Sequence, residues 1–351
     1  MPIIHLDMDY FFGACEELRH PEFRGRPLVV GTSPEKDKLR GVVQTCNYEA
    51  RAFGIKSGMP TAQAFKLHGD LVYLQEDYDY YDGMSRKVYN LLKGYNFPIE
   101  QMSIDEFAID LGGMDFEDAG RLSREIKDRI RNELGLPCTI GISYGKVFAK
   151  MACDDAKPDG LKTVREDEIK EFLREKSVGK LPGVGKKTEE KLHGMGIEKI
   201  GDIAKANVIV LMDKFGVFGR EMYELANGID ESKVVEKYDV LSIGRETTLD
   251  EPTRDARKIN LKLSELAHMV KEEVDKNGFT FKTIGVKVRF QDFTERVRSR
   301  SLQNYSNSEE LMYRTAVDMI AALIGGKEEY VRKVGVRVSS FSGGKGQKRL
   351  F

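Results

Sequence analysis

The sequence has few of the features that mark secreted, zinc-binding or membrane proteins. Its four cysteines, Cys15, Cys46, Cys138 and Cys153, show no Cys-x-x-Cys spacing and no nearby histidine partner, which argues against a disulfide framework and a zinc site. No apolar run approaches the ~20 residues that a membrane span needs, and the first residues lack a signal-peptide pattern. We therefore expect a monomeric cytoplasmic protein with reduced thiols and no membrane partner.

Charge is balanced overall, with 56 Lys+Arg against 57 Asp+Glu, but unevenly distributed. Residues 1–240 have a net charge of −7, whereas residues 241–351 have a net charge of +6. A basic last third is typical of a polyanion-binding region attached to an acidic catalytic body, although a solvated basic surface gives the same count. The five histidines have no triad-like setting, so histidine-based nucleophilic catalysis is unsupported.

Two acidic patches interrupt strand-like apolar runs. Asp7 and Asp9 lie near the start, and Asp105, Glu106 and Asp110 lie beyond residue 100. Acids inside a sheet are costly unless a cation compensates them, and hard divalent ions prefer oxygen ligands. Asp7, Asp105 and Glu106 together predict a site for two Mg²⁺ ions about 3.5–4 Å apart, suited to phosphoryl transfer. The alternative is a set of exposed acids, and we expect structural roles for Asp9 and Asp110.

The order of predicted elements favours an α+β fold with a ferredoxin-like sheet. Setting aside an insertion after the first strand, the order is β-α-β-β-α-β, which pairs strand 1 with the hairpin and brings Asp7 next to Asp105 and Glu106. Residues 166–230 read as helical, 231–241 as a polar connector, and the rest as a second α/β unit. The expected strands are 1–10, 27–31, 41–46, a hairpin over 99–111, 138–143, 160–164, 283–293, 295–303 and 331–341; the expected helices are 47–53, 81–95, 118–134, 146–156, 259–276 and 308–324.

Several cations fit nucleotide or DNA phosphates. Tyr48 and Arg51 lie at the start of a predicted helix, and Lys157 lies at the end of another. A hydroxyl, a guanidinium and an ammonium group at these positions suit the binding of a triphosphate. The run 181–187 fits a helix-hairpin-helix whose glycines approach DNA phosphates, with a plain helical turn as the alternative; its candidates are Gly183, Gly185, Lys186 and Lys187. Strand alternation places two further sets of basic residues, each on one face of its strand. They are Lys287 with Arg289, and Arg296 with Arg298 and Arg300. Each set predicts a basic sheet face that binds DNA phosphates, with a merely solvated face as the alternative.

Taken together, these motifs resemble the Y-family DNA polymerases, of the archaeal or bacterial DNA polymerase IV type. The matching segments run in order and cover the chain to about residue 341; they are 7–12, 47–51, 103–106, 141–143, 146–150, 156–160 and 181–185. The resemblance implies a right-hand architecture with a palm (1–10 and 78–165), small fingers (11–77), a helical thumb (166–230), a linker (231–241), a little finger (242–341) and a tail (342–351).

The resemblance also implies roles for individual residues. Asp7, Asp105 and Glu106 would be catalytic and hold the metals, with the carbonyl of Met8. Phe12 would be the steric gate that excludes a 2′-hydroxyl, where many relatives have tyrosine. The implied nucleotide contacts are Tyr10, Phe11, Phe12, Thr45, Tyr48, Arg51 and Lys157, and Arg337 joins the DNA contacts. Phe107-Ala108 departs from the usual Ala-Tyr, which puts the local packing in doubt.

The implied activity is template-directed addition of dNTPs to a primer by two-metal phosphoryl transfer, with low fidelity and synthesis across damaged DNA. A nucleotidyl cyclase and a catalytically idle DNA-binding scaffold remain as alternatives. The terminal Gln347, Leu350 and Phe351 resemble the peptides by which such polymerases bind a sliding clamp, and a frayed tail is the alternative. The expected partners are primer-template DNA, dNTPs and the clamp.

Overall fold

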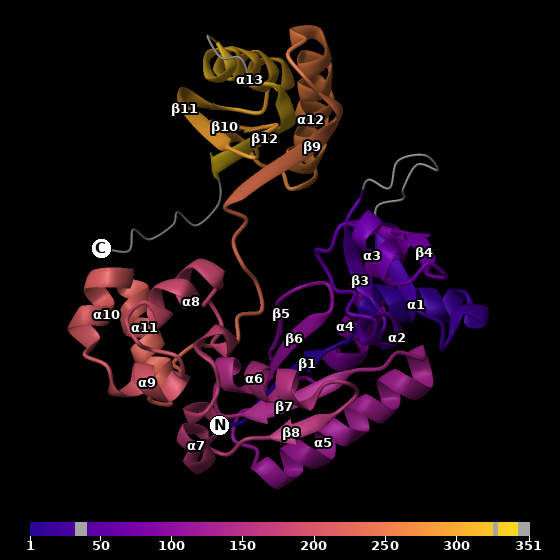
Figure 1. The fold of residues 1–351 in the computed structure, drawn as a ribbon, viewed down its shortest axis with the longest axis vertical. Coiled ribbons are helices and arrows are strands. Elements are labelled where there is room, and N and C mark those ends of the chain that lie inside the picture. The colour runs from indigo at the N-terminus through magenta and orange to yellow at the C-terminus, as the bar shows by residue number, and fades with distance from the viewer. Residues whose placement is uncertain (32–40, 326–328, 343–351) are drawn as a thin grey trace. The chain divides into compact units, whose positions relative to one another are not determined.

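The computed structural model describes residues 1–31, 41–325 and 329–342 (Figure 1). The chain divides into two compact units, Met1–Lys237 and Tyr238–Phe351. The predicted clamp-binding residues Gln347, Leu350 and Phe351 lie outside the described residues. Within the described ranges, no helix is long and apolar enough to cross a membrane.

The first unit is built on a five-stranded sheet in the order β5-β6-β1-β7-β8. β1 pairs antiparallel with both β6 and β7, which is the predicted ferredoxin-like arrangement, and β8 extends the sheet parallel to β7. The strands are β1 (Ile3–Asp7), β5 (Ile99–Gln101), β6 (Glu106–Asp110), β7 (Thr139–Ser143) and β8 (Leu161–Thr163).

Alternation along β1 divides its side chains between two faces of this sheet. Ile4 and Leu6 join the core formed with α4 (Tyr78–Lys93) and α5 (Phe116–Arg129), which a π-helical turn at Ile130–Leu134 extends. Ile3 packs on the opposite face against Ala149 of α6 (Lys146–Ala156). His5 and Asp7 therefore lie on the same side of the sheet as α6.

The insertion after β1 forms a small sheet of its own, in the order β3-β2-β4, with a separate core. Its elements are α1 (Phe11–Arg19), a 3-10 turn (Pro21–Phe23), β2 (Leu28–Gly31), β3 (Val43–Cys46), α2 (Tyr48–Ala52), α3 (Thr61–Leu67) and β4 (Val72–Gln75). All four cysteines of the chain are buried and unpaired, as expected for reduced thiols.

Residues 166–230 are helical, as predicted. The helices are α7 (Ile169–Arg174), α8 (Lys186–His193), α9 (Ile200–Lys205), α10 (Val208–Phe215) and α11 (Val217–Ala226), with 3-10 turns at Glu166–Glu168 and Val178–Lys180. The first part of the predicted connector is held against the sheet, because the backbone nitrogen of Val235 donates to the buried Glu100 carboxylate (2.8 Å).

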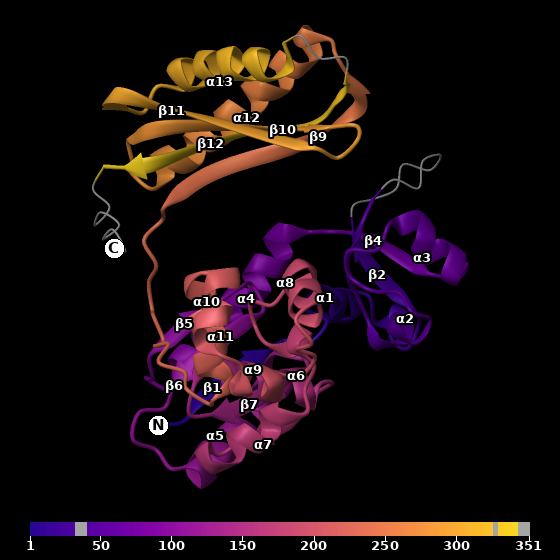
Figure 2. The same ribbon diagram turned by 60° about the vertical axis from the view of Figure 1, so that its left-hand side comes forward.

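The second unit is a four-stranded sheet, β11-β10-β12-β9, with α12 and α13 on one face (Figure 2). Its elements are β9 (Ser242–Thr253), α12 (Ala256–Lys276), β10 (Phe281–Phe290), β11 (Glu295–Ser306), α13 (Glu309–Ile324) and β12 (Val331–Phe341). The sequence reading missed β9, because this edge strand is mostly exposed and lacks a clear apolar alternation.

We predict that Gly141→Ala destabilises the protein by about 1–3 kcal/mol through overpacking. A Cβ at Gly141 would overlap the backbone of Ala149 and Cys153, where α6 packs on β7. Gly113→Ala is the matched control, because a Cβ there meets no atom within 4 Å. Urea unfolding of both variants checks the prediction, which equal stabilities would contradict.

Candidate active site

Strand pairing places two carboxylates of the predicted metal site side by side. Asp7, the last residue of β1, pairs with Glu106, the first residue of β6, and the Met8 nitrogen donates to the Asp105 carbonyl (3.0 Å). Ligand atoms of His5, Asp7 and Glu106 all lie within 4.8 Å of one another. Asp105 occupies the turn before β6, where the Ser103 hydroxyl donates to its carboxylate (2.5 Å).

Two lysines neutralise this acidic pair. The Lys157 ammonium lies 2.5 Å from Asp7, and Lys150 of α6 forms an ion pair with Glu106. Burial raises the pKa of Asp7 to about 7, and Lys157 opposes that rise. The His5 ring and the Lys150 ammonium hold the pKa of Glu106 below its ordinary value. The site is thus an assembled cluster in which buried acid is matched by cationic side chains.

Two members of this cluster were not assigned by the sequence reading. The His5 ring is 1% exposed and has its Nε2 3.8 Å from Glu106, and burial lowers its pKa. Lys150 stands one helical turn after Lys146, which pairs with the buried Glu100 (2.8 Å). That four-residue spacing of lysines facing a carboxylate-bearing sheet was the available signal for Lys150, whereas nothing local distinguished His5.

Asp9 serves as a structural hub beside the cluster. Its carboxylate accepts hydrogen bonds from the Thr139 hydroxyl (2.7 Å) and the Asp159 nitrogen (3.1 Å), and Tyr48 lies at 3.4 Å. Asp110, at the far end of β6, accepts one bond from the nitrogen of Gly112 (2.9 Å). Both arrangements agree with the structural roles expected for these acids.

The predicted gate and its neighbours begin α1, directly after β1. The ring of Phe11 is buried in the core, so Phe11 can meet a nucleotide only through its main chain. The side chain of Tyr10 is partly buried, and its hydroxyl donates to Glu17 (2.9 Å). Phe12 is only partly buried and packs at the edge of the core. Of these three side chains, those of Tyr10 and Phe12 are partly exposed, and that of Phe11 is buried.

The other nucleotide candidates lie on β3 and α2. Arg51 stacks on the Tyr48 ring (4.6 Å), and Thr45 is half-buried on β3. The backbone N–H groups at the start of α2 are partly used, because the Asn47 side chain accepts from the nitrogen of Ala50 (3.0 Å). The five-residue helix therefore offers phosphate mainly the side chains of Tyr48 and Arg51.

The residues of the predicted helix-hairpin-helix are exposed at the start of α8. Gly183 has φ +90°, and a Cβ there would lie 2.8 Å from the Phe218 ring, so this turn requires glycine. Gly185 precedes the helix, and Lys186 and Lys187 form its first turn, all exposed.

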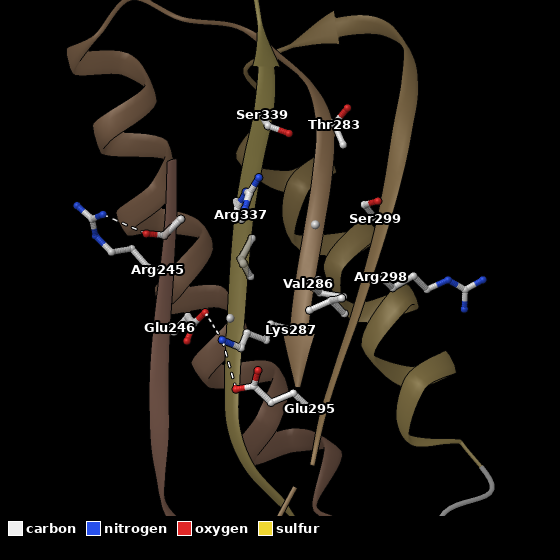
Figure 3. Close-up of a pocket in the computed structure, with 15 residues that line it drawn as sticks. Arg245, Glu246, Thr283, Val286, Lys287, Glu295, Arg298, Ser299, Arg337 and Ser339 are labelled. Atoms are coloured by element: carbon white, nitrogen blue, oxygen red, sulfur yellow. Dashed lines mark hydrogen bonds and ion pairs between the residues drawn. The ribbon is translucent and has the colours of Figure 1, made fainter. Parts of the chain in front are cut away.

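In the second unit, the sheet face away from the helices contains a shallow hollow of about 780 Å³ (Figure 3). Arg337 of β12 lies opposite Gly285 on one side and Gly244 on the other, so its neighbours across both strands have no side chain. Lys287 is held between Glu246 (3.2 Å) and Glu295 (3.4 Å).

The two predicted basic sets of this sheet lie on opposite sides. Arg298 of β11 pairs with Val286 and Arg296 with Val288, and both valines belong to the core. Residues directly opposite in an antiparallel pair share a face, so these arginines project from the edge strand toward the helix side. Consistently, Arg300 lies 3.9 Å from Asp318 of α13. Figure 3 shows the Arg298 side chain extending outward past the edge of the sheet.

Comparison with known proteins identifies the family. The impB/mucB/samB family matches residues 6–154, its C-terminal domain matches residues 240–350, and the DNA polymerase-iota thumb domain matches residues 179–230. DNA polymerase IV of Methanoculleus marisnigri is 40% identical over 343 residues, which cover 97% of this chain and 95% of the relative. DNA polymerase IV of Clostridium perfringens is 36% identical over 341 residues, covering 96% and 94%.

Solved structures agree with this assignment. A Y-family DNA polymerase chimera superposes with a TM-score of 0.91 at 30% identity, over 97% of this chain and 99% of the other. An insertion ternary complex of Dbh DNA polymerase gives a TM-score of 0.69, also at 30% identity, over 97% and 98%. The chain therefore belongs to the Y-family DNA polymerases, of the DNA polymerase IV type, and is a DNA-directed DNA polymerase. The predicted family and α+β fold are confirmed.

We predict that Asp9→Ala lowers the free energy of unfolding by about 2–4 kcal/mol, because it leaves the buried Thr139 hydroxyl and the Asp159 nitrogen without their acceptor. Asp110→Ala removes a single turn bond and should cost about 1 kcal/mol. Urea unfolding measures both. Equal losses would contradict the hub role of Asp9.

Proposed function

We propose that the protein adds deoxynucleotides to a primer 3′-hydroxyl on damaged as well as intact template, with low fidelity. The observation that carries this proposal is the Asp7–Glu106 pair, set at one end of two paired strands and matched by Lys150 and Lys157. Low fidelity rests on the sequence, which offers no third acidic constellation for a proofreading nuclease. Primer extension with single dNTPs, on intact and lesion-containing templates, tests the proposal.

The donor set fits Mg²⁺. Asp7, Asp105 and Glu106 supply carboxylate oxygens and Met8 a carbonyl, which are the ligands that hard divalent ions prefer. Two Mg²⁺ ions bound there would activate the primer hydroxyl and neutralise the triphosphate. Burial raises the pKa of Asp7, and a cation bound beside it would lower that pKa and favour the carboxylate form.

The remaining roles belong to the side chains around this cluster. In our proposal, the Lys157 ammonium leaves Asp7 and pairs with a phosphate oxygen when dNTP enters. Tyr48 and Arg51 bind the outer phosphates. Phe12 lies under the sugar and leaves no room for a 2′-hydroxyl. Because stacking contacts hold Phe12 on Tyr81 and Arg51 on Tyr48 before substrate arrives, binding aligns the primer hydroxyl with the α-phosphorus for in-line attack and loss of pyrophosphate.

We propose that DNA phosphates bind the start of α8, the open sheet face and the arginines of β11. Exposure of Lys186 and Lys187, and glycines on both sides of Arg337, support close approach of a polyanion. Action as a cytoplasmic monomer tethered to a sliding clamp through Gln347, Leu350 and Phe351 stays a prediction from the sequence.

Asp105→Ala and Glu106→Ala should each abolish incorporation, because each removes a metal-binding carboxylate. Primer-template binding should stay within about twofold, since phosphate contacts elsewhere dominate affinity. Single-turnover extension and fluorescence anisotropy measure the two effects. Asp110→Ala, on the same strand as Glu106, is the control that retains activity, and near-normal incorporation by both test variants would remove the metal assignment.

Phe12→Ala should raise the rNTP-to-dNTP ratio of kcat/KM by about 100-fold, because a hydroxyl then fits where a ring stood. The ratio is measured with matched rNTP and dNTP on one template. An unchanged ratio would remove Phe12 from the gate role.

Neutralising Arg296, Arg298 and Arg300 together, or Arg337 alone, should reduce the slope of log K against log salt by roughly 0.9 per lost phosphate contact. Arg257→Ala is the control, because its side chain is 94% exposed on α12 and joins neither set. A slope that changes equally in the control would show that only net charge matters. An unchanged slope for a test variant would place its residues away from DNA.

A further inference from the structure

The gate residue rests on an aromatic platform contributed by α4. The ring of Phe12 stacks on that of Tyr81 at 4.4 Å between centroids and 13° between planes. Tyr78 meets the same ring edge-on, at 5.9 Å and 84°. Both contacts come from the first turn of α4, more than sixty residues away along the chain. The position of the Phe12 ring is therefore set by α4 as well as by its own helix.

A buried hydrogen bond fixes the platform itself. Tyr81 is fully buried, and its hydroxyl donates to Glu16 (2.7 Å), which is 3% exposed. Glu16 lies on α1 one helical turn after Phe12, so the gate and the acceptor of its platform share one helix. Burial and the Glu16 carboxylate both raise the pKa of Tyr81, so the hydroxyl keeps its proton and donates.

The Glu16 carboxylate has a cationic neighbour, Arg19, that offsets its burial. Arg19 lies 3.8 Å from it, and the His20 ring lies 3.9 Å away. Arg19 also pairs with Asp77 (3.0 Å), the residue that caps α4. Charge-assisted bonds of this kind are stronger and more directional than neutral ones, so α1 and α4 are joined next to the gate.

We propose that Glu16 and Tyr81 are positioning residues that set how strictly the enzyme excludes ribonucleotides. This inference rests on the proposed gate role of Phe12. A stacked ring held from below cannot sink away from a 2′-hydroxyl, whereas a ring on a loose platform can retreat and admit it. Neither Glu16 nor Tyr81 touches the substrate; they act through the height and tilt of Phe12.

The test is the rNTP-to-dNTP ratio of kcat/KM in the full-length enzyme, with Phe12→Ala as the reference. Tyr81→Phe keeps the stacked ring and removes one oxygen, and Glu16→Leu removes the acceptor. Each should raise the ratio by about threefold to tenfold, less than the full effect of losing a charge-assisted bond, because the bond acts on selectivity only through Phe12. The rise should come from a lower KM for rNTP, with kcat for dNTP nearly unchanged. The double variant should show no more than either single change, because one bond is lost in each.

Two controls separate positioning from general loosening. Tyr80→Phe removes a neighbouring hydroxyl, which donates to the Cys15 carbonyl (3.3 Å), and should leave the ratio unchanged. Glu16→Gln retains an oxygen acceptor and should restore selectivity to near the wild-type ratio. If Glu16→Leu fails to fold, Tyr81→Phe decides, since it changes no carbon atom of the core.

An unchanged ratio in Tyr81→Phe, alongside a raised ratio in Phe12→Ala, would overturn the inference and leave the gate in place. An equal rise in Tyr80→Phe would also overturn it, because the effect would then be loss of stability in α4. If Phe12→Ala itself has no effect, the gate role fails first, and this inference fails with it.

Discussion

Two carboxylates held side by side by strand pairing are the constraint on which the rest of the first unit depends. The antiparallel register of β1 and β6 puts Asp7 opposite Glu106, and neither can move away without breaking the sheet. The repulsion between the two carboxylates and the cost of burying them must be offset. Lys150, within α6, and Lys157, at the end of α6, provide the compensating positive charge. Close packing of α6 on β7 at Gly141 brings those ammonium groups within reach.

Much of this arrangement could be predicted from the sequence. The β-α-β-β-α-β order is enough to pair β1 with the hairpin, so the approach of Asp7 to Glu106 follows from topology. The helices of residues 166–230 and the exposed basic start of α8 follow from glycine and lysine spacing. These features depend on local residue patterns and on the rules by which consecutive strands and helices connect, and both can be read from a single sequence.

The remainder depends on contacts between distant segments. Tyr81 and Glu16 are 65 residues apart, and neither carries a local sign that they meet. Alternation assigns side chains to one face within a strand but does not relate the faces of two strands, because that requires the register. For this reason the opposite orientations of Lys287 and Arg298 emerged only from the paired strands. The strand β9 was not predicted from the sequence, because an exposed edge strand needs few apolar residues and so shows little apolar alternation.

The ion pairs made from α6 also limit where natural variants of this chain can gain or lose residues. Lys146 holds Glu100 and Lys150 holds Glu106, while Lys157 at the helix end holds Asp7. A helix turns by about 100° per residue, so one inserted or deleted residue within 146–157 would rotate every later lysine off its carboxylate. Insertions and deletions should therefore be excluded from this segment, even where substitutions on its solvent side are tolerated.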